Sequence, residues 1–309
     1  MKSFICRILI FCIPVLGFIL LTEICVRNYP STYRAKKEQL TACKDSVKLL
    51  ILGSSSAMDG IDPAQFSVYA FNLAFAAQPL YYDIKLTEKF LPDLPRLKYV
   101  IITVGYTSLY YDGSDLAFVY KKFFDIGYGN RKFWKEQLLQ SVFAYNSSQV
   151  RYMLTNSFTN LLGNNKLKKD ETNPPVSYLE DVTSDEKGRI RAEIYKAVVN
   201  EYKGGDEIIN ELETFIVFLQ SRNITPVLVS VPYYETIRKY LDESVMEKNE
   251  QVCKTLSEKN HIAFFDFTAD PDFTAPDYHN CDHLNENGAK KFSRKINAKL
   301  MEFEQEEKR

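Results

Sequence analysis

Two short segments of the chain hold the residue types that nucleophilic acyl transfer requires. Residues 49–56 read LLILGSSS, an apolar run that ends in a glycine and three serines, and residues 277–288 read DYHNCDHLNENG. In acyl transfer a histidine takes the proton of a serine hydroxyl, and a third group holds the imidazole in the right tautomer. We therefore expect a serine of the first segment to meet a histidine of the second.

Four apolar runs predict the strands that must carry these segments: residues 47–52, 98–106, 224–234 and 261–268. The runs are continuous rather than alternating, as in strands that are buried on both faces of a parallel sheet. Because helical patterns lie between them, the sequence predicts an α/β fold, a three-layer α/β/α arrangement around a mainly parallel sheet of the flavodoxin-like kind.

Two helical patterns are clear. Residues 206–223 place their isoleucines, leucines and Phe215 on one stripe, and Asn223 is a plausible C-terminal stop. Residues 285–305 repeat the pattern, with Asn285 as the expected N-cap. Active sites of open parallel sheets form at the carboxyl ends of the strands, which is where the serine turn and the histidine segment would lie.

The N-terminus predicts a membrane anchor. Residues 8–22 carry no charge, and residues 4–26 are apolar apart from Arg7, Thr22 and Glu23. A span needs about 20 mostly apolar residues, with Arg7 and Glu23 at the two interfaces. A cleaved signal peptide is the alternative, but no site of small residues follows the apolar run.

The predicted organisation is an anchor over 1–26, a polar juxtamembrane linker over 27–46, and an α/β domain over 47–309. Positive charges flank the anchor on both sides, so their count does not fix its orientation. We expect the large C-terminal part to lie outside the cytoplasm. Residues 107–205 break the strand–helix pattern and predict a helical insertion, with a disordered-looking stretch over 164–188.

Composition excludes several classes of function. The 309 residues carry a formal net charge of −1, which gives no field to hold a polyanion, so we expect no nucleic-acid partner. Three of the six cysteines lie in the first 25 residues, and no C-x-x-C pair occurs, so a zinc site is unsupported. We expect no cofactor.

A metal site is the alternative use of the histidine segment. Imidazole and carboxylate groups suit divalent ions, and a metal-dependent phosphoesterase would need them close together. Since no second ligand set is evident elsewhere apart from Asp59 and Asp62 after the serine turn, we expect no metal. The candidate ligands would be Asp59, Asp62, Asp277, His279, Asp282 and His283.

At these residues the sequence resembles the SGNH/GDSL-type serine hydrolases. Gly53-Ser54-Ser55 stands where that family has Gly-Asp-Ser, and the resemblance makes Ser55 the nucleophile. The segment NCDHLNENG is similar to the family's D-x-x-H block at the opening of the last helix, which makes His283 the base. Membrane-anchored envelope members, such as the D-alanyl transfer proteins of teichoic acid synthesis, share the Gly-Ser-Ser variant. The resemblance covers some 45 residues.

The chain departs from this family at the oxyanion hole, which uses the nucleophile's N–H, a glycine of the second block and an asparagine of the third. Residues 71–78, FNLAFAAQ, hold no glycine, so the main chain of Ala74 or Ala76 would donate, with Asn72 nearby. In the third block, Gly105–Ser108, Thr107 stands at the asparagine position. The candidate oxyanion groups are those of Ser55, Asn72, Ala74, Ala76, Gly105 and Thr107.

The acid position departs as well. The residue three before His283 is Asn280, whose amide oxygen can accept from the ring but does not stabilise the imidazolium. Asp277 could reach the ring if its loop folds back, and we rank it level with Asn280. Asp282 ranks third, because adjacent residues point apart in regular structure.

The resemblance implies a membrane-anchored serine esterase or O-acyltransferase that acts on an acyl group of a cell-envelope glycan or carrier. The expected partners are the membrane and an envelope polysaccharide or an acyl-donor membrane protein. Since the oxyanion and acid positions are altered, the alternative is an inactive binding or scaffold subunit of an envelope polysaccharide assembly.

Overall fold

The computed structural model describes residues 2–161, 181–202 and 205–307, and these form two compact units. The first unit holds residues 2–38 and 115–161. The second holds the remaining described residues, 39–114, 181–202 and 205–307, and carries both segments with the candidate chemistry.

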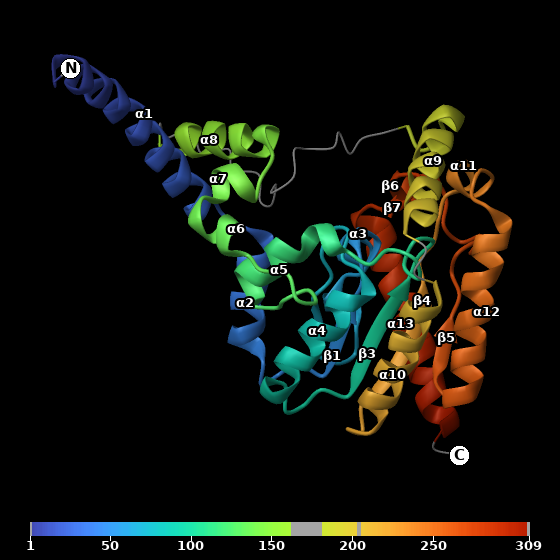
Figure 1. Ribbon diagram of the computed structural model, residues 1–309. Coiled ribbons are helices and arrows are strands. Elements are labelled where there is room, and N and C mark those ends of the chain that lie inside the picture. The colour runs from blue at the N-terminus through green and yellow to red at the C-terminus, as the bar shows by residue number, and fades with distance from the viewer. Residues whose placement is uncertain (1, 162–180, 203–204, 308–309) are drawn as a thin grey trace. The chain divides into compact units, whose positions relative to one another are not determined.

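A five-stranded sheet forms the centre of the second unit, in the order β2-β1-β3-β4-β5, and every neighbouring pair is parallel (Figure 1). The parallel α/β class predicted from the sequence is therefore confirmed. The strands are β1 (Leu49–Leu52), β2 (Ala70–Asn72), β3 (Tyr99–Val104), β4 (Thr225–Ser230) and β5 (Ala263–Phe265).

Helices cover both faces of this sheet. Ile51 and Val229 pack in one apolar cluster with Phe292 and Ile296 of the last helix. Side chains alternate along a strand, so Leu50 points to the opposite face, where it is fully buried. The helices of this unit are α3 (Ser55–Gly60), α4 (Leu80–Phe90), α9 (Asp185–Glu201), α10 (Gly205–Gln220), α11 (Glu235–Arg238), α12 (Glu243–Asn260) and α13 (Glu286–Glu307).

Two local signals that the sequence carried are confirmed. Asn223 has a φ of +58°, a left-handed conformation that asparagine tolerates, just beyond the end of α10. The Asn285 side chain accepts from the N–H groups of Asn287 and Gly288, as an N-cap does. Short 3₁₀ turns occur at Pro63–Gln65, Leu91–Asp93 and Ala275–Asp277. A fourth, Ser114–Leu116, lies at the boundary with the first unit, which continues from residue 115.

Two elements differ from the sequence-based expectation. Strand β2 was missed because it has only three residues and no apolar run. Of the stretch 164–188 that looked disordered, residues 164–180 lie outside the described residues, but 185–188 form the first turn of α9. Its N-cap is Ser184, whose side chain accepts from the Lys187 N–H.

The first unit is helical. It contains α1 (Lys2–Asn28), the start of α2 (Thr32–Cys43), α5 (Ala117–Phe124), α6 (Trp134–Leu138), α7 (Gln140–Phe143) and α8 (Ser147–Leu161). Within the described part of the chain, one helix is long and apolar enough to span a membrane, and it lies at the N-terminus. The expected linker over 27–46 thus contains α2, and the helical segment begins at residue 115 rather than 107.

Candidate active site

The serine turn connects β1 to α3. Gly53 has a φ of +136°, which side-chain-bearing residues avoid, and a Cβ there would lie 1.8 Å from Oγ1 of Thr103. Only glycine therefore fits between the strand and the helix. The turn places the half-buried Ser55 as the first residue of α3, at the carboxyl end of the sheet.

A buried carboxyl group supports this turn from behind. Asp83 of α4 is 2% exposed, and its Oδ1 accepts from the Gly53 N–H at 2.9 Å and from the Gln78 side chain. Burial raises the pKa of Asp83 to about 8, although both hydrogen bonds act in the opposite direction. Sequence reasoning missed Asp83, because a single aspartate in an amphipathic helix carries no signal of its own.

His283 lies on a small hairpin that packs against α3. The hairpin consists of β6 (Tyr278–Asn280) and β7 (His283–Leu284), joined by a two-residue turn and distorted by a register shift. Contacts between β7 and α3 bring the two segments together. His283 Nε2 lies 2.8 Å from Ser55 Oγ, so the serine and the histidine predicted from the sequence form a hydrogen bond.

The other ring nitrogen faces two oxygens. His283 Nδ1 is 3.0 Å from Asp282 Oδ1 and 3.1 Å from Asn280 Oδ1. The Asn280 oxygen also accepts from the Asp282 N–H, which fixes the orientation of the amide. Since both oxygens accept, the proton of the neutral ring lies on Nδ1, and Nε2 is free to accept from the Ser55 hydroxyl.

The charges of this pair stabilise each other. Burial opposes ionisation of Asp282, but the neighbouring His283 and Arg191 lower its pKa to about 2. Burial likewise opposes the imidazolium form, and the Asp282 carboxylate more than offsets it, so the pKa of His283 is raised. The arrangement therefore stabilises a histidine that has taken a proton.

The second oxygen of Asp282 is held by α9. Tyr195 donates to Oδ2 at 2.6 Å, and Arg191 Nε lies 3.6 Å from the same oxygen. Gly188 lets α9 approach α11 closely, because a Cβ there would lie 2.1 Å from the carbonyl oxygen of Thr236. No sequence motif predicts these contacts, since α9 falls in the region expected to be an insertion.

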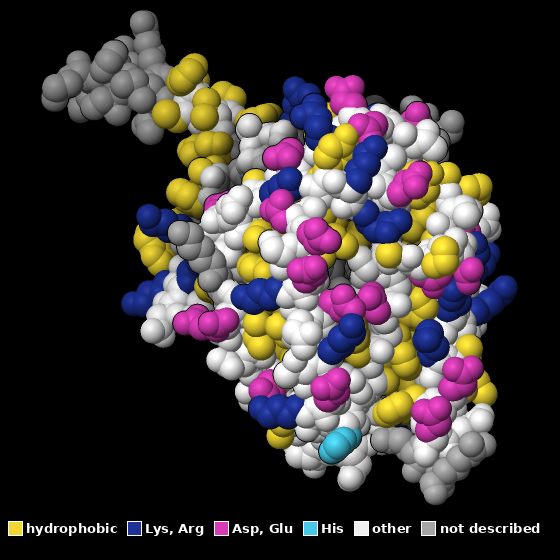
Figure 2. Space-filling view, turned by 90° about the vertical axis from the view of Figure 1, so that its right-hand side faces the viewer, with side chains coloured by type: hydrophobic (Ala, Val, Ile, Leu, Met, Phe, Trp, Pro, Cys, Tyr) yellow, Lys and Arg dark blue, Asp and Glu magenta, His cyan; other side chains and the backbone are white. Residues whose placement is uncertain are grey.

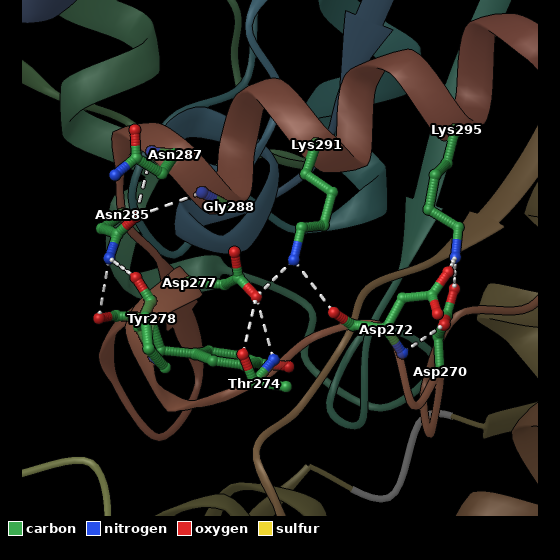
Figure 3. A network of polar contacts seen from close by, with 11 residues as sticks. Asp270, Asp272, Thr274, Asp277, Tyr278, Asn285, Asn287, Gly288, Lys291 and Lys295 are labelled. Atoms are coloured by element: carbon green, nitrogen blue, oxygen red, sulfur yellow. Dashed lines mark hydrogen bonds and ion pairs between the residues drawn. The ribbon is translucent and has the colours of Figure 1, made fainter.

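Asp277 does not orient the ring, which corrects its ranking beside Asn280. Its Oδ2 accepts from Lys291 of α13 at 2.6 Å and from the N–H of Thr274 at 2.9 Å (Figure 3). Burial opposes ionisation, but Lys291 lowers the pKa of Asp277. Asp282 reaches His283 Nδ1 instead, because the turn between β6 and β7 removes the alternation that points adjacent side chains apart.

Two predicted oxyanion groups are engaged in holding α3. The Asn72 amide donates to the carbonyl oxygens of Ala57 and Ile61, at 2.8 and 2.9 Å. Its oxygen accepts from the Ala74 N–H at 3.0 Å. Asn72 and Ala74 thus differ from the expectation, because Asn72, at the end of β2, binds the helix that carries Ser55, and the Ala74 N–H donates to the Asn72 side chain.

The third predicted block follows β3. The Gly105 N–H donates to Ser108 Oγ at 2.9 Å, so this donor is also engaged, while the Thr107 main chain accepts from Tyr110 and Tyr111. A cavity of about 590 Å³ opens beside this loop, at the carboxyl ends of β3, β4 and β5. Its lining includes Gly105, Tyr106, Ser230, Asn249 and Asp266.

The histidine segment does not assemble a metal centre among the described residues. No group of three or more His, Cys, Asp or Glu side chains in that part of the chain is placed to hold an ion. The oxygens of Asp277 and Asp282 face Lys291 and His283, respectively.

Comparisons with known proteins find likeness among solved structures, twelve chains in all. No protein-family model matches the chain, and no curated protein matches it. A crystal structure from Bacteroides fragilis, described as a "putative acylhydrolase", aligns with 85% of this chain and 93% of its own, at 11% identity and a TM-score of 0.42. A likeness at this level carries no argument about chemistry, which depends on the geometry of the site.

Proposed function

We propose that this chain is a membrane-anchored serine esterase or O-acyltransferase of the SGNH/GDSL type. One observation carries the proposal: Ser55 Oγ, His283 and Asp282 form a continuous relay, with contacts of 2.8 and 3.0 Å at the two ring nitrogens. Serine nucleophiles are recognised by this geometry and these roles rather than by sequence position.

The reaction follows from the relay. Ser55 Oγ attacks the acyl carbonyl carbon while His283 Nε2 takes its proton, and the imidazolium is stabilised by Asp282. When the ester bond breaks, His283 gives the proton to the leaving alcohol. A water molecule or an acceptor hydroxyl then attacks the acyl-serine and gives its proton to His283. As the acyl bond to Ser55 breaks, His283 passes this proton to Ser55 Oγ, which restores the serine hydroxyl and the neutral ring.

The oxyanion would be held by fewer groups than the family's pattern supplies. The Ser55 N–H, at the start of α3, is the first donor, and the Thr107 hydroxyl is the second. The N–H groups of Ala74 and Gly105 already donate to side chains. Since one lost donor typically costs about 3 kcal/mol in the transition state, we expect a slow enzyme.

The substrate class is inferred from the anchor. A helix such as α1 would keep the enzyme at the membrane surface, where lipid-linked carriers and envelope glycans are assembled. An acyl-donor membrane protein would be the natural partner for a transferase there. We place the α/β unit outside the cytoplasm as part of this proposal.

An inactive scaffold subunit is the second candidate. The observation that favours it is the engagement of Ala74 and Gly105, which leaves two of the expected oxyanion donors occupied. A scaffold would keep the fold and a polysaccharide-binding role without an activated serine.

Fluorophosphonate labelling of the full chain in detergent separates the two candidates. An activated Ser55 gives a single adduct, mapped by peptide mass, that disappears in Ser55→Ala and in His283→Ala. Ser56→Ala is the matched control, since it removes a neighbouring hydroxyl on the same helix and should label normally. No adduct on folded protein would favour the scaffold and remove the catalytic assignment.

A further inference from the structure

The first unit presents large apolar side chains to solvent on two short helices. Trp134 and Leu138 of α6 are 61% and 64% exposed, and Val142 and Phe143 of α7 are 57% and 49% exposed. Trp134 and Leu138 are four residues apart, so they share one face of α6. We call these four residues the α6–α7 patch.

Two charged residues fix the patch to the end of the apolar helix. Glu23 of α1 is 5% exposed and accepts from the N–H groups of Gln140 and Ser141, at 2.9 and 3.0 Å, where α7 begins. Arg27 donates to the carbonyl oxygens of Gln137 and Leu138, where α6 ends. Glu23, which the sequence predicts at one end of the membrane span, is thus buried against the start of α7.

The position of this attachment along α1 is informative. The side chains of Ile10 to Leu21 are mostly exposed and apolar, and Figure 2 shows hydrophobic side chains gathered along this part of the helix. Glu23 and Arg27 follow Leu21 by two and six residues, about 3 and 9 Å along a helix. The patch is therefore attached where an apolar span would leave the hydrocarbon (Figure 1).

We propose that the α6–α7 patch lies in the interfacial layer of the same bilayer that α1 spans, so that the first unit rests on the membrane as well as crossing it. Tryptophan is enriched at this depth, and short amphipathic helices bind there with their apolar residues inserted. The proposal depends on the anchor assigned under the proposed function but not on the chemistry of Ser55.

Charge favours a lipid surface as the occupant. Anionic lipids attract basic segments next to a membrane span, and this segment is basic. Within residues 23–38 and 115–161 there are five acidic residues: Glu23, Glu38, Asp115, Asp125 and Glu136. The basic ones are twice as many: Arg27, Arg34, Lys36, Lys37, Lys121, Lys122, Arg131, Lys132, Lys135 and Arg151.

The chain contains a built-in probe, because Trp134 is its single tryptophan. The full chain is reconstituted in nanodiscs of phosphatidylcholine and phosphatidylglycerol whose acyl chains carry bromine near the glycerol end or near the methyl end. We expect Trp134 fluorescence to be quenched at least twofold more by the shallow bromines than by the deep ones, and to be protected from acrylamide.

Two other outcomes would overturn the proposal. If Trp134 fluorescence is unaffected by brominated lipid and is quenched by acrylamide, the tryptophan faces water. If neither brominated lipid nor acrylamide quenches the fluorescence, Trp134 is covered by protein, either a second copy of the chain or another membrane protein. Release of the chain from membranes by carbonate would instead refute the anchor, and fluorophosphonate labelling of Ser55 is unaffected by any of these results.

A pair of variants tests the patch itself. Leu138→Glu with Val142→Glu should reduce the lipid quenching of Trp134 several-fold, because carboxylates resist transfer into an anionic interface. Leu138→Ala with Val142→Ala is the matched control and should reduce it less. Equal quenching in all three proteins would mean that the patch does not hold Trp134 at the bilayer.

Discussion

Two buried aspartates flank the candidate site and differ in their protonation. Asp282, beside His283, is 1% exposed and has a pKa lowered to about 2, because His283 and Arg191 offset the effect of burial. Asp83, beneath the serine turn, is 2% exposed and has a pKa raised to about 8, because burial outweighs the hydrogen bonds from the neutral N–H groups of Gln78 and Gly53. Burial is the same at both positions, and the neighbouring cation decides the charge.

The difference assigns separate tasks to the two carboxyl groups. At neutral pH Asp282 is ionised and can stabilise a protonated His283, whereas Asp83 is largely neutral. A neutral group behind Gly53 adds no negative charge near the place where an oxyanion would form on a substrate of Ser55. Asp83 is thus a positioning residue of the turn, and Asp282 is the acid of the relay.

The largest expected effect comes from Asp282→Asn. The amide still accepts from His283 Nδ1 but carries no charge, and the comparable change in a serine protease lowers the rate by about 10⁴. We expect fluorophosphonate labelling of Ser55 to slow by at least about 10³-fold. The midpoint of the pH dependence of the labelling rate should also fall, because the charge of Asp282 that raises the pKa of His283 is gone.

Asp277→Asn is the matched control, since it removes a carboxylate from the same segment that pairs with Lys291 rather than with the ring. Its labelling rate per folded molecule should stay near that of the parent. If both variants slowed equally, the assignment of the acid to Asp282 would be wrong.

The second effect is on stability. Asp83 keeps its proton in the folded chain up to a pH of about 8, but in the unfolded chain it loses the proton near the ordinary aspartate pKa of 3.8. Between these values the folded state binds more protons, so this residue makes the free energy of unfolding fall as pH rises, by at most about 1.4 kcal/mol per pH unit. Asp83→Asn should therefore raise Tm relative to the parent, and more at pH 8 than at pH 5.

Thermal unfolding of the two proteins across this pH range measures the difference. Asp93→Asn is a suitable control, because this exposed aspartate pairs with Lys44 at the surface and should leave the pH dependence unchanged. A gap in Tm that is constant with pH would contradict a neutral Asp83.

The serine turn and the histidine segment show how much of the site the sequence predicts. The strand that ends just before Gly53 and the helix that begins after Asn285 have strong local signals, a continuous apolar run and an N-cap. Their place at the carboxyl edge of the sheet therefore follows from topology. Ser55 and His283 could be paired on that basis, and they are 2.8 Å apart.

The supporting residues could not be found in this way. Asp83 and Tyr195 act through contacts between elements distant in sequence, and neither lies in a motif. The sequence ranks Asp282 third as the acid, because adjacent side chains point apart in regular strands. This rule does not apply to Asp282, which lies in the turn between β6 and β7. Asn72 and Ala74 are oxyanion candidates by analogy with the family, but their hydrogen bonds hold the end of β2 and the helix that carries Ser55.

The smallest effect, and the sharpest test of the comparison, is expected from Asn280→Asp. Asn280 Oδ1 already lies 3.1 Å from His283 Nδ1, so a carboxylate there would share the ring proton with Asp282 and raise the pKa of His283 further. We expect the labelling midpoint to move up by less than about one pH unit and the plateau rate to change only a few-fold, since one carboxylate already serves the ring.

The double variant Asn280→Asp with Asp282→Asn exchanges the two groups. If a carboxylate facing Nδ1 is all that the relay needs, the double variant should recover Ser55 labelling to within about tenfold of the parent. If it stays as slow as Asp282→Asn alone, the acid works only where Tyr195 and Arg191 hold its second oxygen. That result would make Tyr195 and Arg191 of α9 part of the relay. A carboxylate would then support His283 only where these two residues hold its second oxygen, and not merely where it lies close to the ring.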